Sequence, residues 1–147
     1  MSFKISTALR NHMLATGSVK SAMDGGVIKI YAGTEPVDAD AAIGSATLLC
    51  TISNNDAGTG INFDATPTSG VLVKATAEVW SGTCAASGTA TFYRFVSLTD
   101  DGTSSTSFKR MQGTVGVVGA DLLVSSTAFV SANLRQINSF AAGMPSA

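Results

Sequence analysis

The chain has 147 residues, enough for one domain with a hydrophobic core and too few for two comfortable ones. Charged residues make up only 13% of the chain, about half the roughly 25% usual in soluble domains, while 45% are hydrophobic. This composition and a net charge of −1 argue against disorder, and with Lys109-Arg110 as the only adjacent basic pair we expect no nucleic-acid partner.

Neither a membrane segment nor an export signal is expected. No stretch approaches the roughly 18 to 20 apolar residues that span a bilayer, so we expect no membrane partner. Polar residues between 6 and 12 interrupt the apolar run that a signal peptide requires, which predicts synthesis in the cytoplasm without such a peptide. Cys50 and Cys84 are then expected to be reduced and buried, with a disulfide as the alternative. The distance between the two cysteines in the folded chain decides between these states.

The first 25 residues differ from the rest of the chain. Ile5, Leu9 and Met13 recur every four positions, which predicts a short amphipathic helix with Ser6 as its N-cap. A second short turn is expected over residues 19–23, ended by the glycines that follow. We therefore predict an N-terminal helical arm over residues 1–25 and a β-sandwich domain over residues 26–147.

After residue 26 the chain is expected to form strands and turns. Residues 33–46 are interpreted as a connector with one helical turn around 38–42. Glycines within the run 108–118 predict a bulge or close packing against another backbone. Because the helix precedes all the strands instead of alternating with them, the pattern favours an antiparallel β-sandwich or jelly roll over a parallel sheet. The expected strands span residues 27–31, 47–52, 61–63, 71–80, 90–98, 108–118, 121–126 and about 133–141.

Few residues suit catalysis. His12 is the only histidine, so a serine or cysteine nucleophile would have to recruit it. Cys50 and Cys84 have no adjacent cation in the sequence to lower a thiol pKa. Most aspartates fall in expected turns, where their side chains bond to the backbone. We therefore expect no enzyme and no catalytic residue.

Metal and cofactor sites are likewise not expected. One histidine and two cysteines lie too far apart in the sequence to suggest a zinc site. An EF-hand loop starting at Asp38 is excluded, because Ala42 and Ile43 take the places of a ligand and the required glycine. An irregular calcium site in the turn 54–56 is the alternative. The glycine-rich run 113–119 matches no phosphate-binding motif.

The scarcity of charge is the most informative feature. Charge depletion is typical of the cores of protein interfaces, which suggests a subunit of a larger assembly. The apolar side chains of the arm are the candidate partner interface, with packing of the arm on its own sandwich as the alternative. These interface residues are Phe3, Ile5, Leu9 and Met13.

Several stretches together resemble small virion structural proteins of tailed bacteriophages. The resemblance runs over most of the chain as a pattern of strands, turns and small residues. It is carried by residues 9–14 (LRNHML), 24–36 (DGGVIKIYAGTEP), 38–44 (DADAAIG), 80–82 (WSG) and 87–90 (SGTA).

The resemblance implies a head decoration, or cement, protein. Such proteins are β-rich, commonly trimeric, and sit on the outer surface of the major capsid protein lattice, so the expected location is the capsid surface of the virion and the expected partners are the major capsid protein and further copies of the chain. No cofactor is implied. The alternative is a tail-associated structural module or a carbohydrate- or receptor-binding module, for which Trp80, Tyr31 and Tyr93 are the candidate aromatic contacts.

Overall fold

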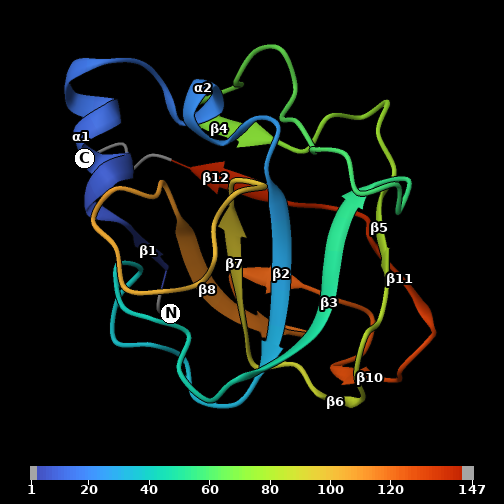
Figure 1. Ribbon diagram of the computed structural model, residues 1–147. Coiled ribbons are helices and arrows are strands. Elements are labelled where there is room, and N and C mark those ends of the chain that lie inside the picture. The colour runs from blue at the N-terminus through green and yellow to red at the C-terminus, as the bar shows by residue number, and fades with distance from the viewer. Residues whose placement is uncertain (1–2, 144–147) are drawn as a thin grey trace.

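The fold consists mainly of short antiparallel strands, with two short helices near the N-terminus. A computed structural model describes residues 3–143 (Figure 1). This architecture confirms the predicted all-β, sandwich-like fold with a small N-terminal helical segment. No helix in the described range is long and apolar enough to cross a bilayer.

An eight-stranded sheet forms the centre of the molecule. Seven strands follow the order β1-β8-β7-β2-β3-β5-β11, and β9 pairs with β8 in parallel, whereas the other pairings are antiparallel. Two-stranded ribbons, β6 with β10 and β4 with β12, complete the fold. The strands are β1 Lys4–Ile5, β2 Val27–Ala32, β3 Thr47–Asn54, β4 Val71–Val73, β5 Trp80–Thr83, β6 Gly88–Thr89, β7 Phe92–Val96, β8 Met111–Gly116, β9 Leu122–Leu123, β10 Ala128–Phe129, β11 Leu134–Ile137 and β12 Ala141–Gly143.

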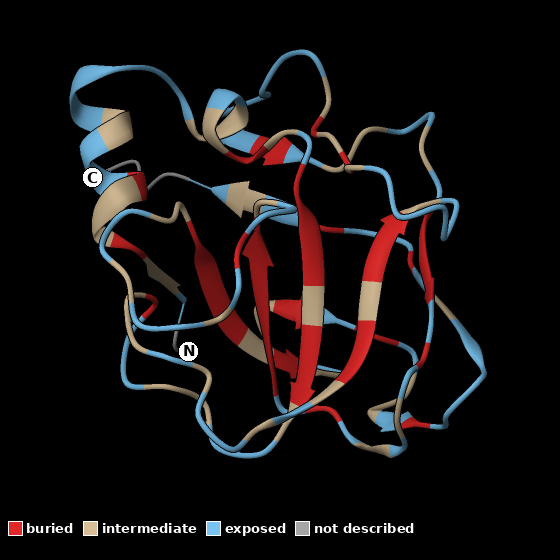
Figure 2. Ribbon diagram, in the orientation of Figure 1, coloured by how far each residue is buried: buried red, intermediate tan, exposed pale blue. Residues whose placement is uncertain are grey.

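One face of the central strands carries the hydrophobic core. Opposed residues of neighbouring strands lie on the same face, and the row Ile28–Phe95–Met111 is fully buried. Over this face four aromatic rings pack mutually, with centroids 5.6 to 6.1 Å apart. Figure 2 shows the buried residues concentrated in β2, β3, β7 and β8. The four rings are those of Phe63, Trp80, Phe95 and Phe140.

The opposite face of the same strands carries a polar row, flanked by the buried apolar pairs Val27–Val96 and Tyr31–Phe92. The row Lys29–Arg94–Gln112 crosses β2, β7 and β8 there. Two long connections, residues 33–46 and 97–110, accept hydrogen bonds from this row and cover it. Loops held by polar contacts therefore form the second layer on this side of the sheet.

The two helices form where the sequence predicts them. α1 Thr7–Ala15 begins after Ser6, whose hydroxyl accepts a hydrogen bond from the backbone of Leu9. α2 Val19–Met23 begins with a capping box. Leu9 and Met23 are buried in the same cluster as the sheet residues, so the helices pack on the strands that follow them.

The prediction of one strand over residues 71–80 is wrong. The chain forms β4, turns, and starts again as β5, because the backbone N–H of Glu78 bonds back to the carbonyl of Ala75 at 3.2 Å. The Glu78 carboxylate holds this corner by accepting hydrogen bonds from the backbone and side chain of Asn62 and from the Trp80 indole. The alternation of apolar residues in the sequence therefore runs from β4 through the corner to β5 and does not mark a single strand.

The helical turn expected around residues 38–42 does not form either. The Asp38 carboxylate accepts hydrogen bonds from the backbone of Asp40 and Ala41. Carbonyls of this segment accept from Arg94 on β7 and from Arg110, which directly precedes β8. These long-range partners replace the bonds that a helix would have made. The expected strand 61–63 is reduced to isolated bridges, and the expected strand 133–141 divides into β11 and the segment leading to β12.

Candidate functional site

The N-terminal arm, the sequence's candidate interface, is bonded to the edge of the sheet. β1 pairs with β8. The Ser6 backbone N–H donates to the Arg110 carbonyl at 3.0 Å, and the Ser6 hydroxyl accepts from the Arg110 N–H at 2.9 Å. The arm therefore has a fixed position on the sandwich over the residues that the structure describes.

The four predicted interface residues have different environments. Leu9 is fully buried in the core, so it offers no surface to a partner and packs as the alternative interpretation expected. Ile5 and Met13 are half-buried against the core. Phe3 is 45% exposed and remains available, as does Leu14, which is 85% exposed.

Met13 also lines an apolar groove between the helices and the β4–β12 ribbon. The groove has a volume of about 550 Å³, and its walls include Val19 from α2, Pro67 from the following loop, and Leu72 and Ala142 from the ribbon. A second hollow, of about 470 Å³, lies on the other side of the ribbon between Val73 and Leu123. The groove beside the helices is therefore mainly apolar, whereas the second hollow has a mixed lining that includes Lys74 and Asp121.

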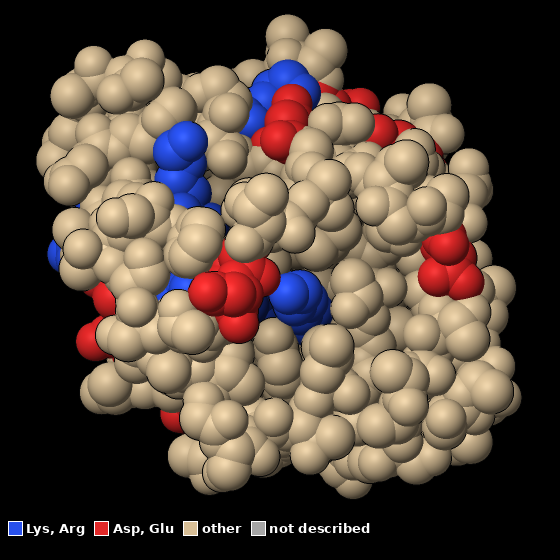
Figure 3. Space-filling model, in the orientation of Figure 1, with Lys and Arg blue, Asp and Glu red and all other residues tan. Residues whose placement is uncertain are grey.

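Exposed apolar side chains are spread over the surface, whereas charged groups are sparse. Figure 3 shows charged residues in a few separated groups, with uncharged surface between them. Among residues 3–143, the large exposed hydrophobic residues are Phe3, Leu14, Val37, Val71, Val73, Val79, Leu98, Val117, Val118, Leu123, Val130 and Leu134.

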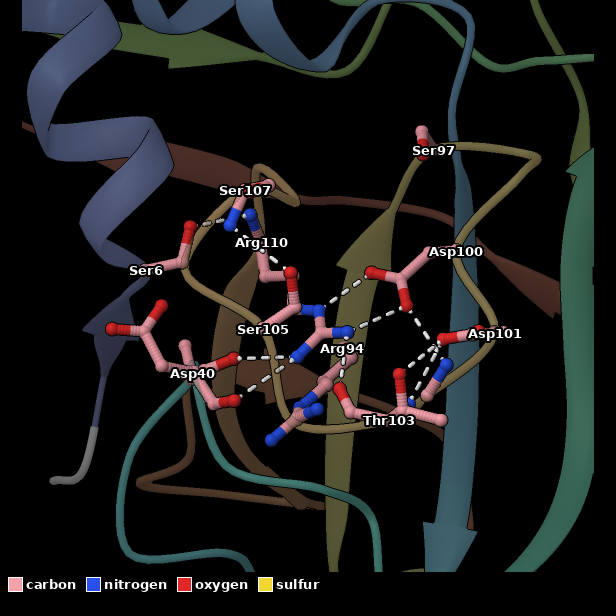
Figure 4. Close-up of polar contacts among 12 residues, drawn as sticks. Ser6, Asp40, Arg94, Ser97, Asp100, Asp101, Thr103, Ser105, Ser107 and Arg110 are labelled. Atoms are coloured by element: carbon pink, nitrogen blue, oxygen red, sulfur yellow. Dashed lines mark hydrogen bonds and ion pairs between the residues drawn. The ribbon is translucent and has the colours of Figure 1, made fainter.

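A buried ion pair joins two residues of the connection 97–110, Asp100 and Arg110 (Figure 4). Arg110 donates from Nε to one carboxylate oxygen of Asp100 at 2.6 Å and from Nη2 to the other at 2.8 Å. Both side chains are almost fully buried. The remaining Arg110 donors reach the carbonyls of Ala39 and Thr103, so one guanidinium joins both connections to β8.

Arg94 on β7 is the second guanidinium of this cluster. It donates from Nε to Gln112 and from Nη2 to the carbonyls of Asp38 and Ala41. Burial, and then the positive charge of Arg110, lower the pKa of Arg94 to about 10. Its Nη1 is buried with no protein partner within the described residues. A bound water is the ordinary partner for such an atom.

This cluster fixes loops; it does not assemble a reaction centre. The donors that are bonded go to backbone carbonyls and to one side chain for each arginine, Gln112 for Arg94 and Asp100 for Arg110. Most aspartates were expected in turns, and the Asp100 carboxylate does accept a hydrogen bond from the Gly102 N–H, but its ion pair with Arg110 was not predicted. The sequence held one signal for this buried cluster: Arg94 is a charged residue between the aromatic residues Tyr93 and Phe95 of an expected strand.

The structure brings His12 to a serine without forming a triad. His12 Nε2 lies 2.9 Å from the hydroxyl of Ser21, on the exposed side of the helices. That hydroxyl is already used in the capping box of α2, where it accepts from the Ser18 N–H and donates to the Ser18 carbonyl. The contact therefore ties α1 to α2.

Metal-ligating residues do not converge in the part of the chain that the structure describes: no group of three or more His, Cys, Asp or Glu side chains could hold an ion. In the turn weighed for calcium, the Asp56 carboxylate accepts from the backbone and hydroxyl of Thr83. Cys50 and Cys84 are both free and buried, as the leading expectation had them.

The aromatic residues considered for sugar binding are all buried. Trp80 is 0% exposed, Tyr93 1% and Tyr31 6%. Trp80 belongs to the aromatic core, and Tyr31 stacks on Phe92 with centroids 5.0 Å apart. None of the three provides an exposed platform for a sugar ring.

Comparisons of the chain with protein-family models, with curated proteins and with solved structures find no match.

Proposed function

We propose that this chain is a structural protein of a tailed-bacteriophage virion, a decoration (cement) protein that binds the major capsid lattice as an oligomer, most simply a trimer. The observation that carries the proposal is that apolar side chains are exposed and charged side chains are sparse on a surface of fixed shape. Burial of apolar surface is the main favourable term in protein association.

The internal bonding of the loops supports a role that depends on rigidity. Arg94 and Arg110 attach the connections 33–46 and 97–110 to the sheet through several hydrogen bonds. Ordering a mobile loop during binding costs free energy, so a surface already fixed in shape binds more tightly. In a lattice, many such weak contacts act together, and each bound copy opposes the separation of neighbouring capsid subunits.

The direct test is binding to capsid shells of the encoding phage. The chain is mixed with expanded and with unexpanded shells, sedimented, and quantified on gels. We expect saturable binding to the expanded shells and a lower rupture temperature for particles that lack the protein. Binding to neither shell, together with an unchanged rupture temperature, would reject the decoration role; recovery with isolated tails would point to a tail protein instead.

Phe3 provides a residue-level test of the arm as an interface. Phe3→Ser removes an exposed aromatic group, so we expect capsid affinity to fall by roughly tenfold, the equivalent of about 1.4 kcal/mol, with no change in melting temperature. Val118→Ser, which removes an even more exposed apolar group outside the arm, is the matched control. Equal affinities for the two variants would remove the arm from the interface.

Multi-angle light scattering of the wild type at micromolar concentration then reports the oligomer, and monomer alone would contradict self-association.

A further inference from the structure

Cys50 and Cys84 face each other across two antiparallel strands. Cys50 lies in β3, Cys84 follows the last residue of β5, and the two form an isolated antiparallel bridge. The Cys84 N–H donates to the Asn133 carbonyl, and the Cys84 carbonyl accepts from the Ala132 N–H, both at 2.9 Å. Because these groups point away from β3, the two cysteines form a non-hydrogen-bonded pair.

Such a pair has the geometry that a disulfide requires. Directly opposed residues of this type have Cα atoms about 4.5 Å apart, within the roughly 4.4 to 6.8 Å found for disulfides. The two side chains also lie on the same face of the sheet, because the residues are directly opposed in this bridge. Gly82 leaves room beside them, and its carbonyl accepts from Cys50 Sγ at 3.3 Å.

We propose that Cys50 and Cys84 are a reversible oxidation site, at which exchange with a small-molecule disulfide such as glutathione disulfide forms a cross-strand bond that fastens β3 to the end of β5. This site is a property of the folded chain alone and does not depend on the proposed capsid partner.

The exchange balances with a single co-reactant. The Cys84 thiolate, having given its proton to solvent, attacks one sulfur of glutathione disulfide, forming a mixed disulfide and releasing one glutathione thiolate. Cys50 Sγ then loses its proton and attacks Cys84 Sγ, which breaks the mixed disulfide and releases the second glutathione thiolate. The two glutathione thiolates take up two protons, so two cysteine thiols are oxidised and one disulfide is reduced to two thiols.

The surroundings set the order of these steps. Cys50 is 0% exposed and Cys84 3%, and the residues beside Cys84, Thr83 and Ala85, are exposed. Burial, and then the charge and hydrogen bond of Cys84, raise the pKa of the Cys50 thiol to about 12, so Cys50 is a poor first nucleophile. Local opening at the end of β5 exposes Cys84 first, and Cys50 resolves the mixed disulfide from within the core.

The test uses the purified, folded wild-type chain. It is incubated in glutathione buffers of increasing oxidation, quenched with acid, alkylated and weighed by mass spectrometry. We expect both thiols to disappear together, with a loss of the mass of two hydrogen atoms and a peptide joining residues 50 and 84. The oxidised chain is expected to melt roughly 5 to 15 °C higher, because the bond closes a loop in the unfolded state. Added dithiothreitol is expected to reverse both changes.

Single variants identify the order of attack. In Cys50→Ser we expect one glutathione adduct, on Cys84, whereas in Cys84→Ser we expect the buried Cys50 to stay free. The wild-type mass measurement stands alone if either variant fails to fold. The proposal is overturned if both wild-type thiols stay free in strongly oxidising buffer under native conditions, if the thiols instead join separate chains, or if the intramolecular bond lowers the melting temperature.

Discussion

Asp100 and Arg110 form a buried ion pair. Removing one partner of a buried pair leaves a charge without compensation, which typically costs about 3 to 5 kcal/mol. We therefore expect Asp100→Ala to lower the free energy of unfolding by about that amount, because the Arg110 guanidinium has no route to water. Urea denaturation measures this change.

Asp101 supplies the matched control for that experiment. It neighbours Asp100 and bonds to Thr103, but it is exposed. Asp101→Ala is expected to change the unfolding midpoint little. Similar midpoints for the two variants would mean that the buried pair does not hold the loop.

Glu78 gives the fold a dependence on acid. Burial alone would raise its pKa, but hydrogen bonds from the backbone and side chain of Asn62 and from the Trp80 indole outweigh burial and lower the pKa below the ordinary value of 4.5. The contribution of Glu78 to stability is therefore complete above that value and is lost as the pH falls through the lowered pKa.

Glu78→Gln removes this titration. We expect the free energy of unfolding of the variant to vary less between pH 5 and pH 3 than that of the wild type, as measured by urea denaturation at stepped pH values. Parallel pH profiles for the two proteins would assign the acid dependence to other carboxyl groups.

At the scale of elements, α1 is part of the domain and not a detached arm. Leu9 is fully buried in the sheet's core, whereas Leu14 on the same helix is 85% exposed. Leu9→Ala is expected to cost about 2 to 5 kcal/mol of unfolding free energy, because it leaves a cavity. Leu14→Ala, measured in the same thermal or urea titration, is expected to stay within about 0.5 kcal/mol of the wild type. A small effect of Leu9→Ala would separate the helix from the core.

The helices and the central strands were predictable because their signals are local. Ser6 caps α1 and the apolar spacing places Leu9 inward, while β2 is a short run of β-branched and aromatic residues. The corner between β4 and β5 was not predictable, since it depends on Glu78 meeting Asn62, which is distant in the sequence.

The candidate site was predictable only in part, for the same reason. The period of four residues in the arm groups Ile5, Leu9 and Met13, but it does not distinguish a face that meets the chain's own sheet from one that meets a partner. The position of Arg94 in β7 marked an unusual strand, yet its partners are carbonyls of a loop more than fifty residues away in the sequence.

At the scale of the whole molecule, the fold makes the surface even poorer in charge than the composition suggests. Arg94, Arg110 and Asp100 are buried, so three of the 19 charged residues of the sequence do not face solvent. The sheet uses these charges to hold its loops, while apolar residues such as Val118 and Leu134 remain exposed. The proposed contacts with neighbouring subunits would cover such residues.

The proposed function requires that the chain be built into the virion in many copies. The decisive measurement is the copy number of the chain in purified particles of the encoding phage, from calibrated gels, with a density map to locate the copies. We predict a copy number comparable to that of the major capsid protein, with density on the outer capsid surface. Absence of the chain from purified particles would contradict the account.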